Sequence, residues 1–436
     1  MKAAMTFFTF FCLLLVSCVW NNDSKKSLVV LINTLPVQQR YLRDEVIGGF
    51  EKLYKCKIHF LNYQTNENLI NLLAADSANT RIALVSVPFD MARDLASSNK
   101  ITPLDDIVSE SVFQFDSEMY FENFLKFGEI DGKYYYLPHK VEVPVLFYLK
   151  SKVSDALSKY LKYQKEIDVV LKAANGFGLP NGYILEENPN EWDLYDIFVV
   201  GYIFANEEYE NGKDGRIFSQ NIFFTSKDNR RVADYASALG ADGEDFQNLS
   251  GEGLEEMRLW KQYFMENNIF NKMSYSRDVS PLESYLAIRN GDIFMAYFVQ
   301  NDCFNVVEGT DESRMFPYIS DVSDVGVALV PSAVSFTLDK NGNLTNAGRR
   351  ISEINGFVWG IPENAKEKDL AYLLIQYLNN RNHNTKESVR FGDIPVRQDV
   401  LTNLQNIYDE RWLGEGYASA IYQIANLFNT ETEKER

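Results

Sequence analysis

The sequence is poor in the residues from which small secreted scaffolds and metal sites are built. It has four cysteines and three histidines in 436 residues, too few for a disulfide framework and not spaced as a zinc site. Positive charge is also scarce, because 43 Lys and Arg face 61 Asp and Glu, for a formal net charge of −18. A surface this acidic repels phosphate groups, which argues against a nucleic-acid partner.

Catalytic and nucleotide-binding motifs are missing as well. The chain contains neither G-x-x-x-x-G-K-[ST] nor G-x-S-x-G, and the partial dinucleotide fingerprint that starts at 176–178 lacks its third glycine. No pattern predicts a metal or another cofactor. What is present is an ordinary globular composition, 46% hydrophobic and 24% charged, and a length that suggests two or three domains.

The N-terminus has the pattern of a targeting segment. Lys2 precedes an apolar run at 7–16, which is shorter than the ~20 residues that span a bilayer. The run ends in LVSC at 15–18, which resembles the lipobox of bacterial lipoproteins. That resemblance implies a signal peptide at 1–17, a lipid on Cys18 and a polar tether at 18–26. A plain signal peptide with an incidental cysteine is the alternative.

Strands and helices alternate through the first hundred residues. Strands are expected at 27–32, 56–61 and 81–87, with amphipathic helices between them. This β-α-β-α-β order predicts a parallel sheet with crossover helices, and hence an α/β fold. Further along, the pattern predicts these elements: a hairpin at 127–137, strands at 143–149, 293–299, 325–330 and 356–361, and helices after 151, at 251–270 and at 368–378.

Four segments, taken in order, match the motifs of one known family. They are 130–138 (IDGKYYYLP) with the strand up to 150, 284–296 (SYLAIRNGDIFMA), 356–378 with IPENAK inside it, and 392–398 (GDIPVRQ). In this order they resemble the extracellular solute-binding proteins of ABC transporters, the family 1 group that includes the maltose-binding protein. The resemblance implies a two-lobed periplasmic-binding-protein fold of type II, each lobe a mixed sheet flanked by helices, with hinge strands between the lobes.

The same resemblance implies where the chain passes between lobes. The expected crossings are near 140–144, 327–332 and 379–391. The N-terminal lobe is then 27–141 with 331–380, and the C-terminal lobe is 142–330 with 381–436. Cys56 and Cys303 fall in different lobes on this division and are not expected to pair, because a disulfide needs Cα atoms within ~7 Å.

The resemblance also suggests ligand-binding residues. Glu142 stands where the maltose-binding protein has a hydroxyl-binding glutamate at the hinge, although a hinge glutamate can also serve only to accept backbone N–H groups. Asp90, with Phe89, follows strand 81–87, where relatives place a sugar-binding aspartate. Near 299–301 this chain has VQN in place of the family's usual Gly-Pro-Trp platform, which disfavours a maltodextrin-like ligand. The remaining candidates are Phe298, Trp359, Arg397 and Trp412, although tryptophan is more often a core residue.

We therefore expect a lipid-anchored, monomeric binding protein that captures an extracytoplasmic solute and delivers it to the permease subunits of an ABC transporter. A sugar or oligosaccharide is the expected solute. Two alternatives stay open at this point: a sensor or surface adhesin of the same fold, and a lipid-anchored glycan hydrolase.

Overall fold

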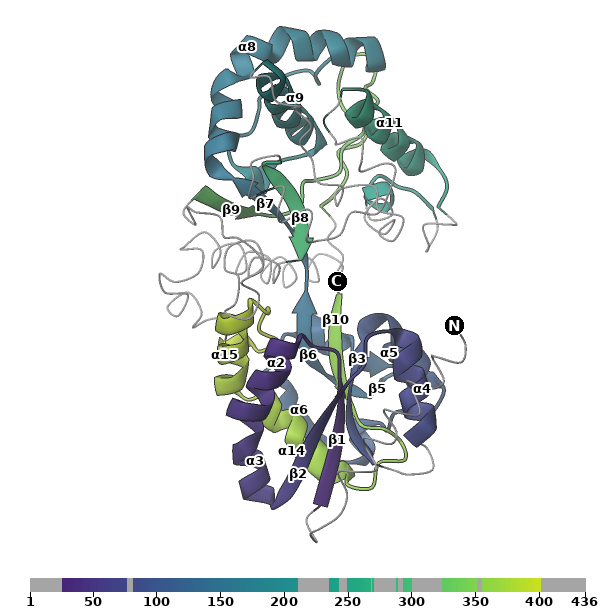
Figure 1. Cartoon of the computed structure of the whole chain (residues 1–436). Coiled ribbons are helices and arrows are strands. Elements are labelled where there is room, and N and C mark those ends of the chain that lie inside the picture. The colour runs from purple at the N-terminus through teal and green to yellow at the C-terminus, as the bar shows by residue number, and fades with distance from the viewer. Residues whose placement is uncertain are drawn as a thin grey trace, which may run out of the picture.

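The computed structural model describes the following residues: 26–76, 81–210, 235–242, 249–267, 269, 288, 293–299, 324–350 and 355–400. They form two α/β lobes joined by strands (Figure 1). The expected signal peptide, Cys18, Cys303 and Trp412 lie outside the described residues. Within the described ranges no helix is both long and apolar enough to cross a bilayer.

The N-terminal lobe is built on a five-stranded sheet with the strand order β2-β1-β3-β10-β6. The first three strands are parallel, as the sequence predicts, and β10 runs antiparallel between β3 and β6. The strands are β1 (Lys26–Ile32), β2 (Cys56–Asn62), β3 (Ile82–Pro88), β6 (Tyr136–Glu142) and β10 (Asn355–Gly360). A separate hairpin of β4 (Glu129–Ile130) and β5 (Lys133–Tyr134) turns at Asp131 and Gly132, both at positive φ, as predicted.

Helices cover both faces of this sheet (Figure 1). On β1, Leu28 and Val30 face one core and Val29 and Leu31 face the other, which is the alternation of a strand buried on both sides. One face is covered by α4 (Asn66–Asp76) and α5 (Phe89–Ser97). The other is covered by α2 (Pro36–Tyr41), the π-helical turn η1 (Leu42–Val46), α3 (Ile47–Tyr54), α14 (Lys368–Leu378) and α15 (Arg381–Phe391). The short segments η2 (Leu104–Asp106), α6 (Glu110–Ser117) and α7 (Glu122–Lys126) connect β3 to the hairpin.

The C-terminal lobe has a three-stranded antiparallel sheet and an aromatic core. The sheet has the order β8-β7-β9. Its elements are β7 (Pro144–Leu149), α8 (Lys150–Asn175), η3 (Pro189–Glu191), α9 (Leu194–Glu210), α11 (Glu252–Glu266), β8 (Met295–Val299) and β9 (Val325–Ala328). Fully buried Trp260 donates its Nε1–H to the Val334 carbonyl at 2.7 Å and meets Tyr195 and Phe336 edge-on.

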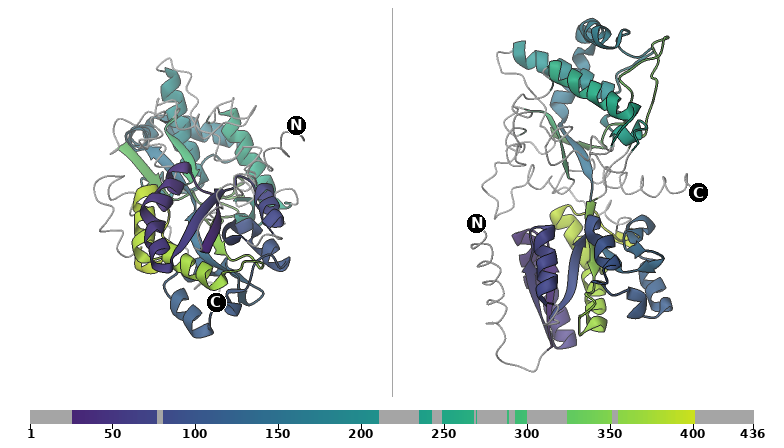
Figure 2. Two further views of the ribbon diagram at one scale, coloured as in Figure 1. Left: turned by 60° about the horizontal axis from the view of Figure 1, so that its bottom comes forward. Right: turned by 90° about the vertical axis from the view of Figure 1, so that its right-hand side faces the viewer.

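The first crossing lies where the sequence predicts it. β6 ends at Glu142 and β7 begins at Pro144, so a single residue, Val143, separates a strand of one lobe from a strand of the other. The right-hand view of Figure 2 shows the two lobes end to end with strands between them.

The second crossing is further along the chain than expected. The prediction assigned 331–350 to the N-terminal lobe, but Ser332 N donates to the Trp192 carbonyl at 2.9 Å and Phe336 N to the Glu256 carboxylate at 2.6 Å, both in the C-terminal lobe. The next strand of the N-terminal lobe is β10, so the chain crosses between 350 and 355. The segment is held by buried side chains such as Phe336 and by backbone hydrogen bonds in turns, and hydrophobic periodicity does not reveal which lobe these contacts join.

The last boundary also differs from the prediction, which placed 381–436 in the C-terminal lobe. Residues 381–400 belong to the N-terminal lobe instead. Phe391 packs edge-on against Tyr41 at 5.5 Å, Arg390 pairs with Glu45 at 2.5 Å, and Ile394 bridges to Val141. Most of the buried residues of α15 are polar (His383, Asn384 and Ser388, beside Phe391), so its sequence does not read as a buried surface. Residues 401–436 lie outside the described part.

Candidate functional site

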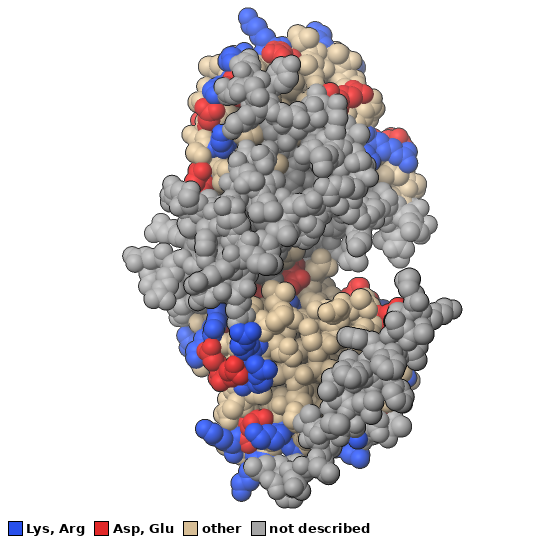
Figure 3. Space-filling view, viewed as in Figure 1, with Lys and Arg blue, Asp and Glu red and all other residues tan. Residues whose placement is uncertain are grey.

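The topology brings four strand ends to one edge of the N-terminal sheet. β1, β2, β3 and β6 point the same way, because β10 is antiparallel to both β3 and β6. β6 ends at the crossing, so all four carboxyl ends face the C-terminal lobe. We call this edge the junction edge; in open α/β sheets such an edge is where ligands bind. Figure 3 shows acidic side chains where the two lobes meet.

Asp90 lies on the junction edge. It follows β3, is exposed, and accepts a hydrogen bond from Asn66 Nδ2 at 3.2 Å. An acidic side chain in the first turn of α5 also stabilises the helix by interacting with its dipole. Besides this structural role, the exposed carboxylate can accept further hydrogen bonds from a ligand.

Phe89 forms a stacked pair with Phe127 beside Asp90. The two ring centroids are 4.2 Å apart and the ring planes differ by 12°. A Cβ on Gly356 of β10 would lie 2.9 Å from Phe89 Cζ and 2.2 Å from the Lys140 carbonyl oxygen, and the φ of Gly356 is +152°. Glycine is therefore required at 356 so that the Phe89 ring can lie against β10.

Glu142 ends β6 and pairs with a lysine on the same strand. Lys140 Nζ lies 2.9 Å from Glu142 Oε1, and the two side chains are 11% and 22% exposed. The pair shares one face of β6 because side chains two residues apart point the same way. The lysine ammonium also lies 4.7 Å from the centroid of the Phe357 ring. Sequence reasoning missed Lys140, although this spacing from Glu142 was available as a signal.

Two further carboxylates and an amide sit close to Lys140. Gln38 Nε2 donates to Asp393 Oδ2 at 3.2 Å inside the lobe. Burial, with repulsion from Asp393, raises the pKa of Glu387 to about 8. Burial lowers the pKa of Lys140, but attraction to Glu142, Asp393 and Glu387 reverses this, and the net shift is upward. Lys140 therefore stays protonated, surrounded by the acidic side chains of this cluster.

Two predicted aromatic candidates lie inside the lobe cores. Trp359 is 1% exposed, stacks on His139 at 3.9 Å and donates Nε1–H to Asn379 Oδ1 at 3.3 Å. Phe298 is 2% exposed and packs edge-on against Phe147 at 5.6 Å. The structure therefore does not bring either ring to the junction edge.

Arg397 is engaged within its own lobe. Its Nε and one terminal nitrogen donate to the two carboxylate oxygens of Asp399, each at 2.9 Å, and its backbone bridges to Tyr120. This bidentate pair uses two of the five N–H donors of the guanidinium. Trp412, the remaining candidate, lies outside the described residues.

One close carboxylate pair resembles a catalytic pair, but it caps a helix. Asp193 N donates to Asp196 Oδ2 at 2.9 Å, and Asp196 N donates to Asp193 Oδ1 at 3.2 Å, which is the reciprocal arrangement of a capping box at the start of α9. Burial and repulsion by Asp196 raise the pKa of Asp193. The backbone contacts account for both side chains without catalysis.

The described part of the chain holds no group of His, Cys, Asp and Glu that could bind a metal ion. His139 is buried, hydrogen-bonds to Ser86 Oγ at 2.8 Å, and has its pKa lowered well below the usual value by burial and by Lys140. It is therefore a neutral core residue.

Comparison with protein families finds a match to the family described as "Bacterial extracellular solute-binding protein", over residues 45–410. No curated protein sequence matches the chain significantly.

Solved structures share the whole two-lobed fold at low identity. Maltose-bound MalE3 of T. maritima superposes with a TM-score of 0.62 at 14% identity, covering 92% of this chain and 88% of that one. The GacH receptor of Streptomyces glaucescens, solved unliganded and with acarbose, gives 0.61 at 15% identity and 94% of both chains. An ABC transporter solute-binding protein of Thermotoga lettingae bound to α-D-tagatose gives 0.58 at 14% identity and 93% of both.

Proposed function

The chain belongs to the bacterial extracellular solute-binding proteins, and from that premise we propose that it captures a carbohydrate at the junction edge and delivers it to an ABC transporter. Members of the family bind solutes rather than transforming them, which excludes the hydrolase alternative. They act outside the cytoplasm. The similar structures named above hold maltose, acarbose or tagatose, which supports a carbohydrate as the solute class.

The observation that carries the proposal is the placement of Asp90 and Glu142. Both follow or end strands whose carboxyl ends face the other lobe, with β10 alone between those strands. Exposed carboxylates accept hydrogen bonds from sugar hydroxyls, and the neighbouring Phe89–Phe127 pair offers apolar surface for a sugar ring. Lys140 holds Glu142 in place, so the acceptor is oriented before the ligand arrives.

Native mass spectrometry of the purified full-length protein in detergent tests the solute class, because a co-purified ligand is weighed directly. Titration with maltose, acarbose and tagatose follows. Asp90→Asn and Glu142→Gln should each weaken binding ten- to a hundred-fold, since a charge-assisted hydrogen bond contributes about 1.5–3 kcal/mol.

Asp94→Asn, one turn further along α5, is the matched control because it removes the same charge from an exposed position. The Asp94→Asn variant should bind the sugar with the same affinity as the unmodified protein. Reduced melting temperatures with unchanged affinity in both site variants would make Asp90 and Glu142 structural residues.

We also propose that Cys18 carries a lipid that anchors the protein to a bacterial membrane. The LVSC end of the apolar run supports this, and acyl chains would retain a chain whose charge of −18 does not attract anionic lipid. Cys18→Ala should abolish labelling by a clickable palmitate analogue and release the protein from membranes. Labelling at the unmodified level would place the lipid elsewhere.

A further inference from the structure

Arg350 lies on the C-terminal lobe close to the crossing. It ends the segment 331–350, and five residues later Asn355 opens β10 and pairs with Glu142. A chain spans at most ~3.6 Å per residue, so the Cα atoms of Arg350 and Asn355 are at most about 18 Å apart. Arg350 therefore lies within about 18 Å of the residue that pairs with Glu142 at the junction edge.

The neighbours of Arg350 lie at the same end of the C-terminal sheet. β8 and β9 run antiparallel to β7, which begins at the crossing, so their carboxyl ends face the junction edge. Just after β9, Leu329 N donates to Asn190 Oδ1 at 3.1 Å, and Arg350 reaches the carbonyl of nearby Trp192 at a long 3.5 Å. Tyr297, two residues before the end of β8, also lies near Arg350.

The guanidinium has more donors than partners. Arginine carries five N–H donors, and the hydrogen bond to Trp192 is the single one it makes with described residues. Its Nε is fully buried and has no hydrogen-bond acceptor within the described ranges, and it forms no ion pair there. Burial lowers the pKa of Arg350, while Glu191 attracts it from outside ion-pair distance.

An arginine in this state contrasts with two cations of the N-terminal lobe. Lys140 is paired with Glu142, and Arg397 is bidentate with Asp399. Within the described part of the chain the partly buried Arg350 has no paired anion, which is costly, and it keeps its charge because arginine does not deprotonate in proteins. An anion bound at Arg350 removes that cost.

We propose that Arg350 binds the carboxylate of the solute, and hence that the solute is an acidic sugar such as a uronic acid or a short uronide. This rests on the proposed function and narrows its substrate class. A guanidinium matches a carboxylate in a bidentate geometry. A monoanion suits the surroundings better than a phosphate dianion, because Asp90, Glu142 and Glu191 all add negative charge near the crossing.

Isothermal titration of the full-length protein with matched sugar pairs tests this. The probes are galacturonate against galactose, glucuronate against glucose, and digalacturonate against galactobiose. The acid of at least one pair should bind at least tenfold more tightly than its neutral partner. Arg350→Gln should remove at least tenfold of that affinity and change the affinity of the neutral sugar by less than twofold.

Two variants control for folding and for bulk charge. Arg350→Lys keeps the charge but loses the bidentate geometry, so its affinity for the acid should fall between those of the unmodified protein and Arg350→Gln. Arg349→Gln removes the same charge from an exposed neighbour and should leave the affinity unchanged. Raising NaCl from 50 to 500 mM should weaken the binding of the acidic sugar and leave the binding of the neutral sugar unchanged.

The outcomes separate this inference from the function it rests on. Tight binding of neutral sugars that Arg350→Gln leaves unchanged overturns the inference and keeps the carbohydrate function. Tighter binding of glucose 6-phosphate than of glucuronate overturns the choice of carboxylate. If neither neutral nor acidic sugars bind, the carbohydrate function itself fails and the inference falls with it.

Discussion

The two lobes differ in how their described cations are paired. On the N-terminal side Lys140 meets Glu142 at 2.9 Å and Arg397 meets Asp399 at 2.9 Å twice, so each cation is neutralised within its own lobe. On the C-terminal side Arg350 makes one long hydrogen bond and no ion pair with the residues the structure describes. Among the described residues, the N-terminal lobe therefore holds paired cations, whereas Arg350 of the C-terminal lobe keeps unused hydrogen-bond donors.

The two cores differ as well. The N-terminal lobe buries aliphatic strands on both faces of one sheet, while the C-terminal lobe packs rings around Trp260 beside a small sheet. Fully buried tryptophans lie in both cores: Trp192 and Trp260 in the C-terminal lobe and Trp359 in the N-terminal lobe. Substitutions of comparable size in each lobe can therefore show whether the lobes are stabilised independently.

The largest expected effect is the loss of a core tryptophan. Trp260→Ala and Trp359→Ala should each destabilise their lobe by about 3–5 kcal/mol, because each removes a buried indole and its hydrogen bond. Hydrogen exchange read by mass spectrometry should show loss of protection in the lobe that carries the change. Equal loss in both lobes would mean that they unfold as one unit.

The second largest effect is expected on removing the ion pair between Lys140 and Glu142. Lys140→Met leaves Glu142 and Asp393 without their cation, and we expect a loss of roughly 2–3 kcal/mol, below the 3–5 kcal/mol of a fully buried pair because both side chains keep some exposure. Thermal unfolding measures it. Lys26→Met, which breaks the exposed pair with Glu367, is the control and should cost under about 1 kcal/mol.

A double variant sharpens this experiment. In Lys140→Met with Glu142→Gln the orphaned charge is gone, so part of the lost stability should return. A double variant as unstable as the sum of the two single variants would mean that the two side chains do not interact energetically.

Much of the fold could be predicted because it rests on periodicity. The parallel β1, β2 and β3, the hairpin at Asp131, and α14 follow from apolar spacing and turn residues, and the structure confirms them. The lobe boundaries at 331–350 and 381–400 could not be predicted, because backbone hydrogen bonds and a polar helix face fix those segments. Local sequence carries no sign of such long-range contacts.

The site was predictable where it depends on strand ends. Asp90 and Glu142 follow from the position of β3 and β6. Trp359 and Phe298 lie inside the lobe cores, which the sequence alone does not show, because whether a ring faces a core or a surface depends on what packs above it. Arg350 carried no pattern in the sequence, since the absence of a hydrogen-bond acceptor for its Nε among the described residues is a property of the folded lobe.

The acidic cluster of the N-terminal lobe should respond to pH. The pKa of Glu387 is raised to about 8 in the folded protein from an ordinary value of 4.5, so the native state binds the proton more tightly. Stability should fall as pH rises from about 4.5 to 8. Glu387→Gln should remove this slope and stabilise the protein by roughly 1–2 kcal/mol at pH 8, a figure reduced for partial exposure. Melting temperatures of both proteins at pH 5, 6.5 and 8 measure this pH dependence. The same slope in the unmodified protein and in Glu387→Gln would contradict the raised pKa of Glu387.

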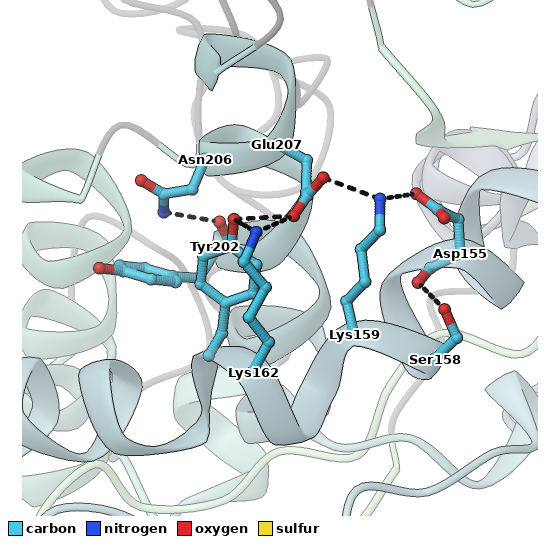
Figure 4. A network of polar contacts seen from close by, with 8 residues as sticks. Asp155, Ser158, Lys159, Lys162, Tyr202, Asn206 and Glu207 are labelled. Carbon is cyan, nitrogen blue, oxygen red and sulfur yellow. Dashed lines mark hydrogen bonds and ion pairs between the residues drawn. The ribbon is translucent and has the colours of Figure 1, made fainter.

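The smallest effect is expected in the C-terminal lobe, where the shift has the opposite sign. Glu207 on α9 accepts hydrogen bonds from Lys159, Lys162 and Tyr163 of α8, at 2.8, 2.9 and 2.8 Å (Figure 4). These contacts, the lysines first, lower its pKa from 4.5 to about 2. The stability that Glu207 contributes is therefore present above pH 4.5 and is lost as pH falls toward 2.

Glu207→Gln should cost about 1 kcal/mol at pH 7, because the network lies at the edge of the lobe and water screens it. The difference from the unmodified protein should shrink at pH 3 and in 1 M NaCl. Glu166→Gln is the matched control, since Glu166 lies on α8 and accepts one hydrogen bond from Tyr202 of α9 at 2.7 Å. A cost for Glu207→Gln that is the same at pH 3 and pH 7 would show that it comes from packing between α8 and α9, and that charge at this surface contributes nothing to holding the two helices together.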